Sequence, residues 1–120
     1  MGARILIVED STLVTDAFDV LFSAAGYDIE IAATVDDAIR QASAGDVDLM
    51  LLDLTLPDGS GLDVLERLRA LGRLPRVTIA MTGHDDQRIR ERCFNAGCAD
   101  VLLKPLPIGD LLRHIERHLA

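Results

Sequence analysis

Short, continuously apolar runs alternate with segments of helical period along the chain, and this alternation restricts the fold more than any other feature. The runs RILIV, DLMLL, RVTIAM and ADVLL are apolar at consecutive positions instead of at every second position. This pattern is typical of strands that are covered on both faces, as in parallel sheets. With DIEIA as a further run, the sequence predicts five strand-helix repeats between Arg4–Val8 and a last helix that ends at Leu119.

The segments between the runs have the periodicity of helices that bury one face. In segment 11–25 apolar residues recur at intervals of three and four, and a second helix is expected over 34–44. Thr34 and Ser60 are candidate N-caps. The glycines expected to end the first, third and fourth helices are Gly26, Gly72 and Gly97. Five such repeats with right-handed crossovers predict an α/β fold with a doubly wound, five-stranded parallel sheet.

Length and composition exclude several classes of protein. The 120 residues suffice for one core, and with no linker in view we expect residues 1–120 to be a single domain. The net charge of −8 argues against broad electrostatic binding to nucleic acid or to anionic membranes. We see no membrane-length apolar stretch and no signal-peptide pattern, so we expect a cytoplasmic protein. Cys93 and Cys98 lack the further ligands of a zinc site, and we expect them to fill gaps in the core.

Polar side chains stand where four of the five apolar runs end. The first run ends at Glu9 and Asp10, the third at Asp53, the fourth at Thr82 and the fifth at Lys104. In a doubly wound sheet, ligands bind beyond the carboxyl ends of the strands. We therefore expect these side chains to share one rim and to carry the chemistry.

The residue types at this rim favour phosphoryl transfer with a divalent cation. Clustered carboxylates repel one another unless a pKa rises or a cation joins them. Asp10 and Asp53, with a backbone carbonyl nearby, offer the oxygen ligands that Mg²⁺ prefers. Thr82 and Lys104 would surround the oxygens of a phosphoryl group, and Asp53 is the natural nucleophile. Lys104 is the only lysine among the 12 basic residues, and its compact ammonium suits contact with a phosphoryl oxygen.

In these features the chain resembles the receiver domain of response regulators in two-component signalling, over essentially its whole length. The matching motifs are the acid pair Glu9-Asp10, the segment DLTLPDGSG with Pro57 and Gly61 four and eight residues after Asp53, Thr82 before a small residue, and Lys104-Pro105. The resemblance implies a flavodoxin-like (βα)5 fold with strand order 2-1-3-4-5.

The resemblance also implies a function, in which Asp53 accepts a phosphoryl group from a phosphohistidine. The donor would be a sensor histidine kinase or a histidine phosphotransfer protein. Mg²⁺, with Mn²⁺ as an alternative, would be held by Asp10, Asp53 and the backbone carbonyl of Thr55, and Glu9 would act through water. Such a domain is not an enzyme in the usual sense, because it only dephosphorylates its own phosphoaspartate, slowly.

A switch in conformation is the third implication. Thr82 and Lys104 would move toward the phosphoryl oxygens, and the peptide bond before Pro105 is usually cis. Receivers commonly carry Tyr or Phe three positions before the lysine, where this chain has Val101, so the usual aromatic coupling is in question. The last two strand-helix units would form the output face toward a downstream protein target or an effector domain. We expect a monomer or a phosphorylation-dependent dimer, without direct contact to nucleic acid or membrane.

Several residues keep two interpretations. Thr55 and His84 stand two positions after Asp53 and Thr82, where family members tune the lifetime of the phosphoryl group, but His84 is equally well an exposed loop residue. His114 and His118 are four apart on the last helix and could chelate a metal, yet we expect solvated residues suited to a helix C-terminus.

Surface charge and turn residues also admit two interpretations. The run RIRER, with Arg88, Arg90 and Arg92, is expected to be a solvated face, with a docking patch for an acidic partner as the alternative. Asp58 and Gly59 follow Pro57 in a Pro-Asp-Gly sequence that favours a tight turn, and we expect them to shape the loop beside Asp53 as well.

Two other functions remain to be weighed against the phosphoryl acceptor. A protein-interaction module of the same fold would work without phosphorylation, but it would not require Asp10, Asp53 and Lys104 together. A free-standing aspartate-nucleophile phosphatase would need a second Asp two residues after the nucleophile, where Thr55 stands.

Overall fold

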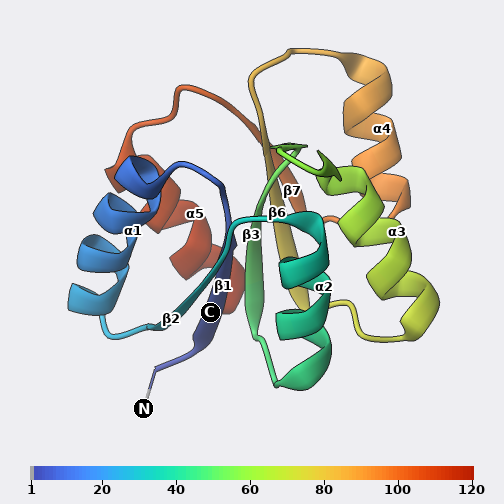
Figure 1. Cartoon of the computed structure of the whole chain (residues 1–120). Coiled ribbons are helices and arrows are strands. Elements are labelled where there is room, and N and C mark those ends of the chain that lie inside the picture. The colour runs from blue at the N-terminus through green and yellow to red at the C-terminus, as the bar shows by residue number, and fades with distance from the viewer. Residues whose placement is uncertain (1) are drawn as a thin grey trace.

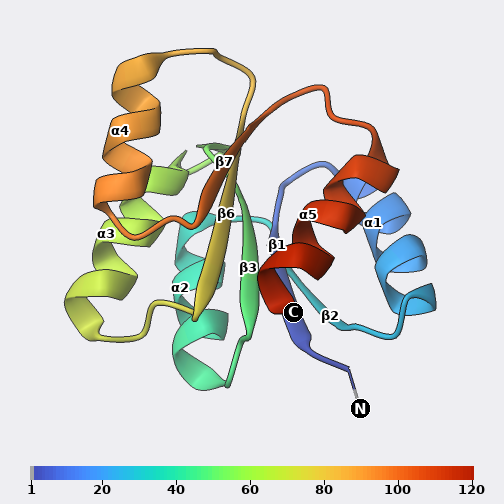
Figure 2. The same cartoon turned by 180° about the vertical axis from the view of Figure 1, so that it is seen from behind.

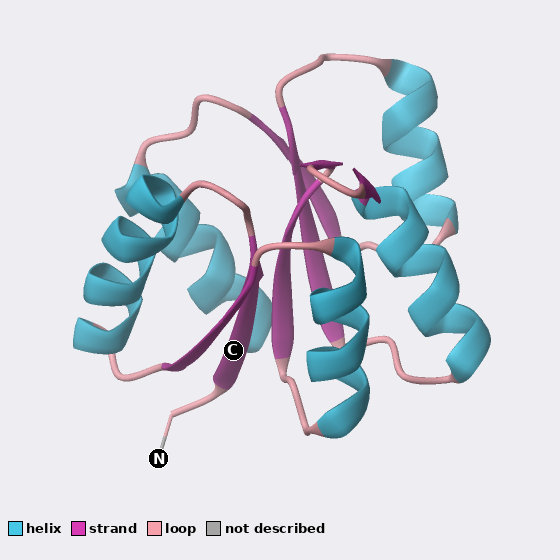
Figure 3. Cartoon of the chain, viewed as in Figure 1, coloured by secondary structure: helices cyan, strands magenta, loops and turns pink. Residues whose placement is uncertain are grey.

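The main sheet has five parallel strands with helices on both faces (Figures 1 and 3). A computed structural model describes residues 2–120; Met1, which the single-domain prediction includes, lies outside the described residues. The sheet order is β2-β1-β3-β6-β7. Because β6 and β7 are the fourth and fifth strands of this sheet, the predicted order 2-1-3-4-5 is confirmed. The bounds are β1 (Arg4–Val8), β2 (Asp28–Ala32), β3 (Leu49–Asp53), β6 (Val77–Thr82) and β7 (Asp100–Leu103).

The helices divide between the two faces of the sheet. Their bounds are α1 (Thr12–Ala24), α2 (Val35–Ala44), α3 (Gly61–Leu71), α4 (Gln87–Asn95) and α5 (Ile108–Leu119). Figures 1 and 2 show α1 and α5 together on one face and α2, α3 and α4 on the other. Each predicted strand-helix unit is therefore present. Where the sequence predicted both ends of an element, each observed end differs from the predicted one by one residue at most.

The consecutive apolar positions of the strands fill two separate cores. In β1, Leu6 and Val8 belong to the core under α2, α3 and α4, whereas Ile5 and Ile7 belong to the core under α1 and α5. Side chains alternate between the two faces of a strand, so a strand covered on both faces needs apolar residues at every position. Cys93 and Cys98 are buried in the first of these cores, as predicted.

Local signals fix the ends of the helices. Thr34 caps α2 by accepting a hydrogen bond from the Asp37 amide at 3.1 Å. Ser60 caps α3 as part of a capping box with Asp63. Gly72 ends α3 with φ of 68°, in the left-handed region that glycine adopts without strain. Both predicted N-caps are thus confirmed.

A short hairpin between β3 and α3 was not predicted as strand. Its strands β4 (Thr55–Leu56) and β5 (Gly59–Ser60) are antiparallel, and Pro57 and Asp58 form the turn. The Pro-Asp-Gly sequence indicated the turn correctly, but two-residue strands are too short for a periodicity signal.

Asp58 connects this hairpin to the N-terminus of α2. Its carboxylate accepts hydrogen bonds from the amides of Val35 at 2.7 Å and Asp36 at 3.3 Å. The two amides, the Val35 amide above all, lower the pKa of the Asp58 carboxyl. A residue five positions after Asp53 therefore caps a helix that precedes Asp53 in the chain.

Among residues 2–120, no helix is long and apolar enough to cross a membrane.

Candidate functional site

Strand register brings the predicted polar residues to one end of the sheet. Val8 pairs with Leu52, so the residues that follow β1 lie beside the end of β3. Asp53 in turn pairs with Met81 of β6, and Thr82 pairs with Leu103 of β7. The four chain segments that end in polar residues therefore end side by side, as the sequence predicts.

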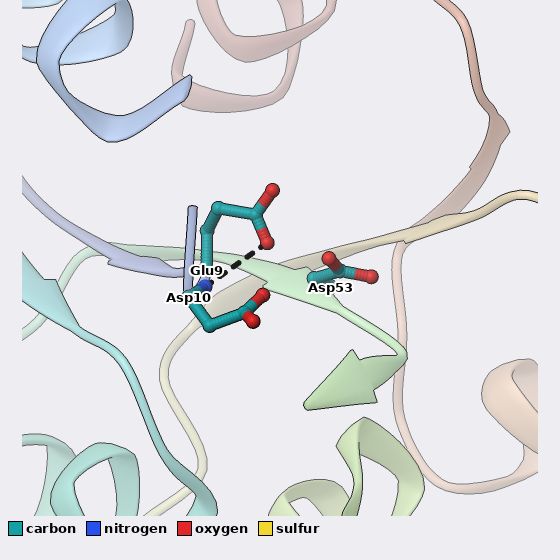
Figure 4. Close-up of side chains that lie close together, drawn as sticks. All are labelled: Glu9, Asp10 and Asp53. Carbon is teal, nitrogen blue, oxygen red and sulfur yellow. Dashed lines mark hydrogen bonds between the residues drawn. The ribbon is translucent and has the colours of Figure 1, made fainter. Parts of the chain in front are cut away.

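Glu9, Asp10 and Asp53 form an acidic cluster at this end of the sheet. A carboxylate oxygen from each lies within 4.8 Å of the others. Figure 4 shows the three side chains directed toward a common space, with Glu9 accepting a hydrogen bond from the Asp10 amide at 3.1 Å. Glu9 and Asp53 are buried, whereas Asp10 is exposed.

The donor set of this cluster fits Mg²⁺. Carboxylate oxygens are the ligands that this ion takes, and the exposure of Asp10 leaves room for the several waters that Mg²⁺ retains. Two buried carboxylates next to each other also need a positive charge or a proton between them. Glu9, Asp10 and Asp53 are therefore the residues that could hold such an ion.

The pKa values of the two buried acids move apart. Burial, followed by a hydrogen bond to Asp53 and the charge of Asp53, raises the pKa of Glu9 from 4.5 to about 8. Burial also raises the pKa of Asp53, but hydrogen bonds from Glu9, from the Thr55 amide and from Lys104 outweigh it and hold that pKa below its usual value. Glu9 therefore keeps the proton and Asp53 is the ionised carboxylate.

Both oxygens of Asp53 are held in place. Oδ1 accepts the Thr55 amide at 3.0 Å, and Oδ2 accepts the Lys104 ammonium at 3.1 Å. Lys104 is part-exposed, and the expected cis peptide bond to Pro105 is present. The lone lysine is thus oriented on the Asp53 carboxylate, where its charge favours the ionised form.

Thr82 reaches the same end of the sheet, but its hydroxyl is directed to its own loop. The buried Oγ1 accepts the His84 amide at 3.1 Å. His84 itself is exposed, as is Thr55. The two side chains predicted to tune the phosphoryl lifetime are therefore both exposed to solvent.

Val101 is buried and packs on the face covered by α4. Its carbonyl accepts a hydrogen bond from Arg90 at 3.3 Å. The position that commonly holds an aromatic ring is therefore filled here by a small core residue.

Two predictions for charged residues outside the site need correction. His114 and His118 are not fully solvated: both are partly buried, and both face Asp100 of β7, because the four-residue spacing puts them on the helix face that covers the strand. In the basic run of α4, Arg88 and Arg92 are exposed as predicted, whereas Arg90 is partly buried and donates to the Val101 carbonyl. Arg92 also pairs on the surface with Glu66 of α3 at 3.3 Å.

An apolar pocket beside the site was not foreseen. It has a volume of about 280 Å³ and lies between α1 and α5, with Phe18, Leu106 and Leu111 among its lining residues. Glu9 and Lys104 form its polar end. Its walls come from helices far apart in the sequence, so no local pattern reveals it.

Comparison with known proteins identifies relatives over nearly the whole chain. The family model described as "Response regulator receiver domain" matches residues 5–116. The transcriptional regulatory protein DltR of Streptococcus agalactiae is 34% identical over 113 residues, which are 94% of this chain and 50% of DltR. The swarming motility regulation protein RssB of Serratia marcescens is 35% identical over 113 residues, covering 94% of this chain and 51% of RssB. The chain thus spans about half the length of these curated relatives.

Solved structures agree with this result. A response regulator receiver domain protein from Methanospirillum hungatei JF-1 superposes with a TM-score of 0.91 and 32% identity, covering 99% of this chain and 94% of that one. The receiver domain of the sensor histidine kinase PA1611 from Pseudomonas aeruginosa PAO1 superposes with a TM-score of 0.85 and 31% identity, covering 99% and 98%. That structure has a magnesium ion coordinated in its active-site cleft.

Proposed function

This chain belongs to the response regulator receiver domain family, and we propose that it is a switch in which Asp53 accepts a phosphoryl group from a phosphohistidine. The observation that carries the proposal is the environment of Asp53. Its ionised carboxylate lies between an acid pair and the only lysine of the chain, at the carboxyl ends of the strands. A phosphoryl acceptor requires this combination of nucleophile, cation site and ammonium.

In the proposed reaction an oxygen of Asp53 attacks the phosphorus of the phosphohistidine. The new P–O bond forms as the P–N bond breaks, and the electron pair of the broken bond returns to the imidazole of the partner. Mg²⁺ at Asp10, Asp53 and the Thr55 carbonyl, with Glu9 through water, would neutralise phosphoryl oxygens. Glu9 would lose its proton when the ion arrives, because the ion replaces the proton as the positive charge between the acids.

Lys104 and Thr82 would complete the site after transfer. The Lys104 ammonium, now 3.1 Å from Asp53, needs only a change of side-chain torsions to reach a phosphoryl oxygen. The Thr82 hydroxyl would exchange its contact with the His84 amide for another phosphoryl oxygen. That movement would pull on the loop before α4 and change the face made by β6, α4, β7 and α5.

The partners follow from the same scheme. We propose a sensor histidine kinase or a histidine phosphotransfer protein as donor, and a protein target or an attached effector domain as recipient of the signal. DltR and RssB are regulators about twice as long as this chain, which supports an effector domain in that role. We further propose that residues 1–120 act as one cytoplasmic receiver domain with slow autophosphatase activity, and that Thr55 and His84 set its rate.

Intact-mass spectrometry after incubation with acetyl phosphate and Mg²⁺ tests the acceptor. The chain should gain the mass of one phosphoryl group, and Asp53→Asn should gain none because the amide is not nucleophilic. Asp46→Asn is the matched control, since Asp46 is exposed and precedes β3 at the other end of the sheet. Omission of Mg²⁺, with chelator added, should also prevent the gain.

Two results would reject the proposal. An adduct that persists in Asp53→Asn would place the acceptor elsewhere. Absence of any adduct on the native chain, with both acetyl phosphate and a phosphorylated histidine domain as donors, would favour the phosphorylation-independent interaction module.

A further inference from the structure

Three metal-ligating side chains meet between α5 and β7, away from the acidic cluster. His114 Nδ1 and His118 Nε2 lie 3.4 Å and 3.2 Å from the same oxygen, Oδ2 of Asp100. Asp100 begins β7, whereas Lys104 follows its end, so this group lies at the opposite end of the strand from Asp53. Because side chains alternate along β7, Asp100 faces α5 together with Leu102, and Val101 faces α4.

The hydrogen bonds of this group leave acceptor atoms facing each other. Arg117 lies 2.6 Å from His114 Nδ1 through its Nη2, and a guanidinium can only donate. In the tautomer that makes this contact, His114 Nδ1 offers its lone pair to the guanidinium. That lone pair lies 3.4 Å from a carboxylate oxygen, which is also an acceptor. Two acceptors at this distance are stable when a cation lies between or beside them, and Arg117 now supplies it.

The other carboxylate oxygen of Asp100, Oδ1, already accepts a hydrogen bond from the backbone. Oδ1 accepts a hydrogen bond from the Val101 amide at 2.9 Å, which fixes the carboxylate on the strand. Oδ2 contacts His118 Nε2 at 3.2 Å, and a metal ion bound between these two atoms would replace that hydrogen bond. The three side chains are each about one quarter exposed, at 26%, 23% and 24%, so an ion can enter from solvent.

We propose that His114, His118 and Asp100 bind one zinc ion. Two imidazole nitrogens and one carboxylate oxygen suit Zn²⁺, which takes such mixed sets with water in the fourth position. Mg²⁺ prefers oxygen ligands alone, so the acidic cluster and this site select different ions. The His118 and His114 rings would bind through the nitrogens that now face Asp100.

Binding requires a local rearrangement. Among the described residues, only Glu9, Asp10 and Asp53 already bring three ligand atoms within 4.8 Å of one another. One histidine ring must therefore rotate to close the set, and the Arg117 side chain must withdraw from His114. Both moves are changes of side-chain torsion, one in a partly buried histidine and one in the exposed Arg117. Arg117 thus competes with the metal for the same lone pair.

The consequence of binding is a cross-link between α5 and β7. The ion would connect two turns of the helix to the strand at the edge of the sheet, since β7 is the last strand in the order. These two elements belong to the face that the proposed phosphorylation changes. Zinc at this place would restrict α5 independently of the state of Asp53.

Calorimetric titration of the full chain with ZnCl₂, in excess MgCl₂, tests the site. One ion should bind per chain, and the ring resonances of His114 and His118 should shift in NMR spectra. His84→Ala should bind like the native chain, because the third histidine is exposed on the loop after β6. His114→Ala, His118→Ala and Asp100→Asn should each weaken binding at least about tenfold, the lower end of the loss seen even for residues that only support metal ligands.

Arg117→Gln gives the sharpest test, because it should tighten zinc binding by removing the competing guanidinium, whereas simple loss of surface structure would weaken it. Circular dichroism establishes that each variant is folded. The proposal is overturned if His118→Ala binds zinc as tightly as the native chain, if Asp53→Asn abolishes binding in excess MgCl₂, or if one ion binds per two chains. The last result would indicate a site between molecules.

Discussion

Glu9 is buried, although it follows β1 directly and is next to the exposed Asp10. Its position puts a carboxyl group beside the ionised Asp53, and both burial and that charge raise its pKa to about 8. The acid pair therefore has unequal members. Asp10 is exposed to solvent, whereas Glu9 keeps its proton up to a pH of about 8. A divalent cation bound at the cluster would replace that proton.

This unequal pair predicts how stability depends on pH without metal. Between about 4.5 and about 8, Glu9 keeps its proton in the folded chain and loses it in the unfolded chain. The folded state then binds more protons, so the free energy of unfolding falls as pH rises through this window, by at most about 1.4 kcal/mol per pH unit for one proton. Urea unfolding in chelator at several pH values measures the slope.

Glu9→Gln provides the comparison for this experiment, since the amide cannot titrate. Its stability should change less over the same window than that of the native chain. Equal slopes for the two proteins would contradict the assignment of the proton to Glu9.

At the residue scale, sequence reasoning found the rim residues because strand ends are visible in the apolar pattern. Asp53, Thr82 and Lys104 each follow a run, and their positions needed only the assumption of a parallel sheet. Asp58 and the Asp100–histidine group could not be found this way. Asp58 contacts residues at least 22 positions away in the chain, and Asp100 of a strand contacts two histidines of a helix. The sequence alone does not show which side chains meet between such distant segments.

The start of α3 packs closely against the backbone of Asp53 and Leu54. A Cβ on Gly61 would lie 2.5 Å from the Asp53 carbonyl oxygen and 2.9 Å from Leu54 Cα, both of them backbone atoms. The Gly61 amide also donates to the Leu54 carbonyl at 3.0 Å. The glycine eight residues after Asp53 is therefore required by close approach of the chain to itself.

Gly61→Ala should lower the free energy of unfolding by about 1 to 3 kcal/mol, the usual cost of forcing an extra carbon into a packed site. Gly109→Ala in α5 is the matched control, because no heavy atom lies within 4 Å of its added Cβ. This control should be neutral or raise stability by about 0.5 to 1 kcal/mol, as alanine does in helices. Urea unfolding measures the free energy of unfolding of both variants. If Gly61→Ala is as stable as Gly109→Ala, the structure relaxes around the added carbon at position 61.

At the scale of elements, the helices and main strands were predictable because each has a periodic pattern and a start or stop signal. The hairpin β4–β5 was not predictable, because each of its strands has two residues, too few for an alternating pattern to be recognised. Its existence depends on what surrounds it, namely the capped N-termini of α2 and α3.

The whole molecule consists of two cores that share one sheet. Each strand contributes side chains to both cores, so loss of one core exposes the other face of the same strands. We therefore expect the chain to unfold as one unit. The order of the strands was predictable from the doubly wound pattern and the resemblance, whereas the pocket between α1 and α5 emerged only from the assembled structure.

Mg²⁺ should raise the stability of this unit, because the acidic cluster exists only when the ends of β1 and β3 are adjacent. An ion that binds only the folded state adds about 2.7 kcal/mol at a concentration 100 times its dissociation constant. Thermal unfolding with MgCl₂ and with chelator measures the shift, which Asp10→Asn should largely remove. A shift of equal size in Asp10→Asn would place the ion outside the cluster.

The hydrogen bonds from Asp58 to the start of α2 have a consequence for how the chain can vary in length. The segment from Asp53 to Gly61 is held at two points, at the hairpin turn by the hydrogen bonds of Asp58 with two amides of α2 and at its end by the packing of Gly61 on the backbone of Asp53 and Leu54. A residue inserted between Asp53 and Gly61 would break either the hydrogen bonds of Asp58 or the packing of Gly61, both close to Asp53. The loop after Thr82 has an open environment at Gly83 and exposed side chains at His84 and Asp85. Insertions and deletions that leave the surroundings of Asp53 intact are therefore expected on the Thr82 side of the site and not on the Asp58 side.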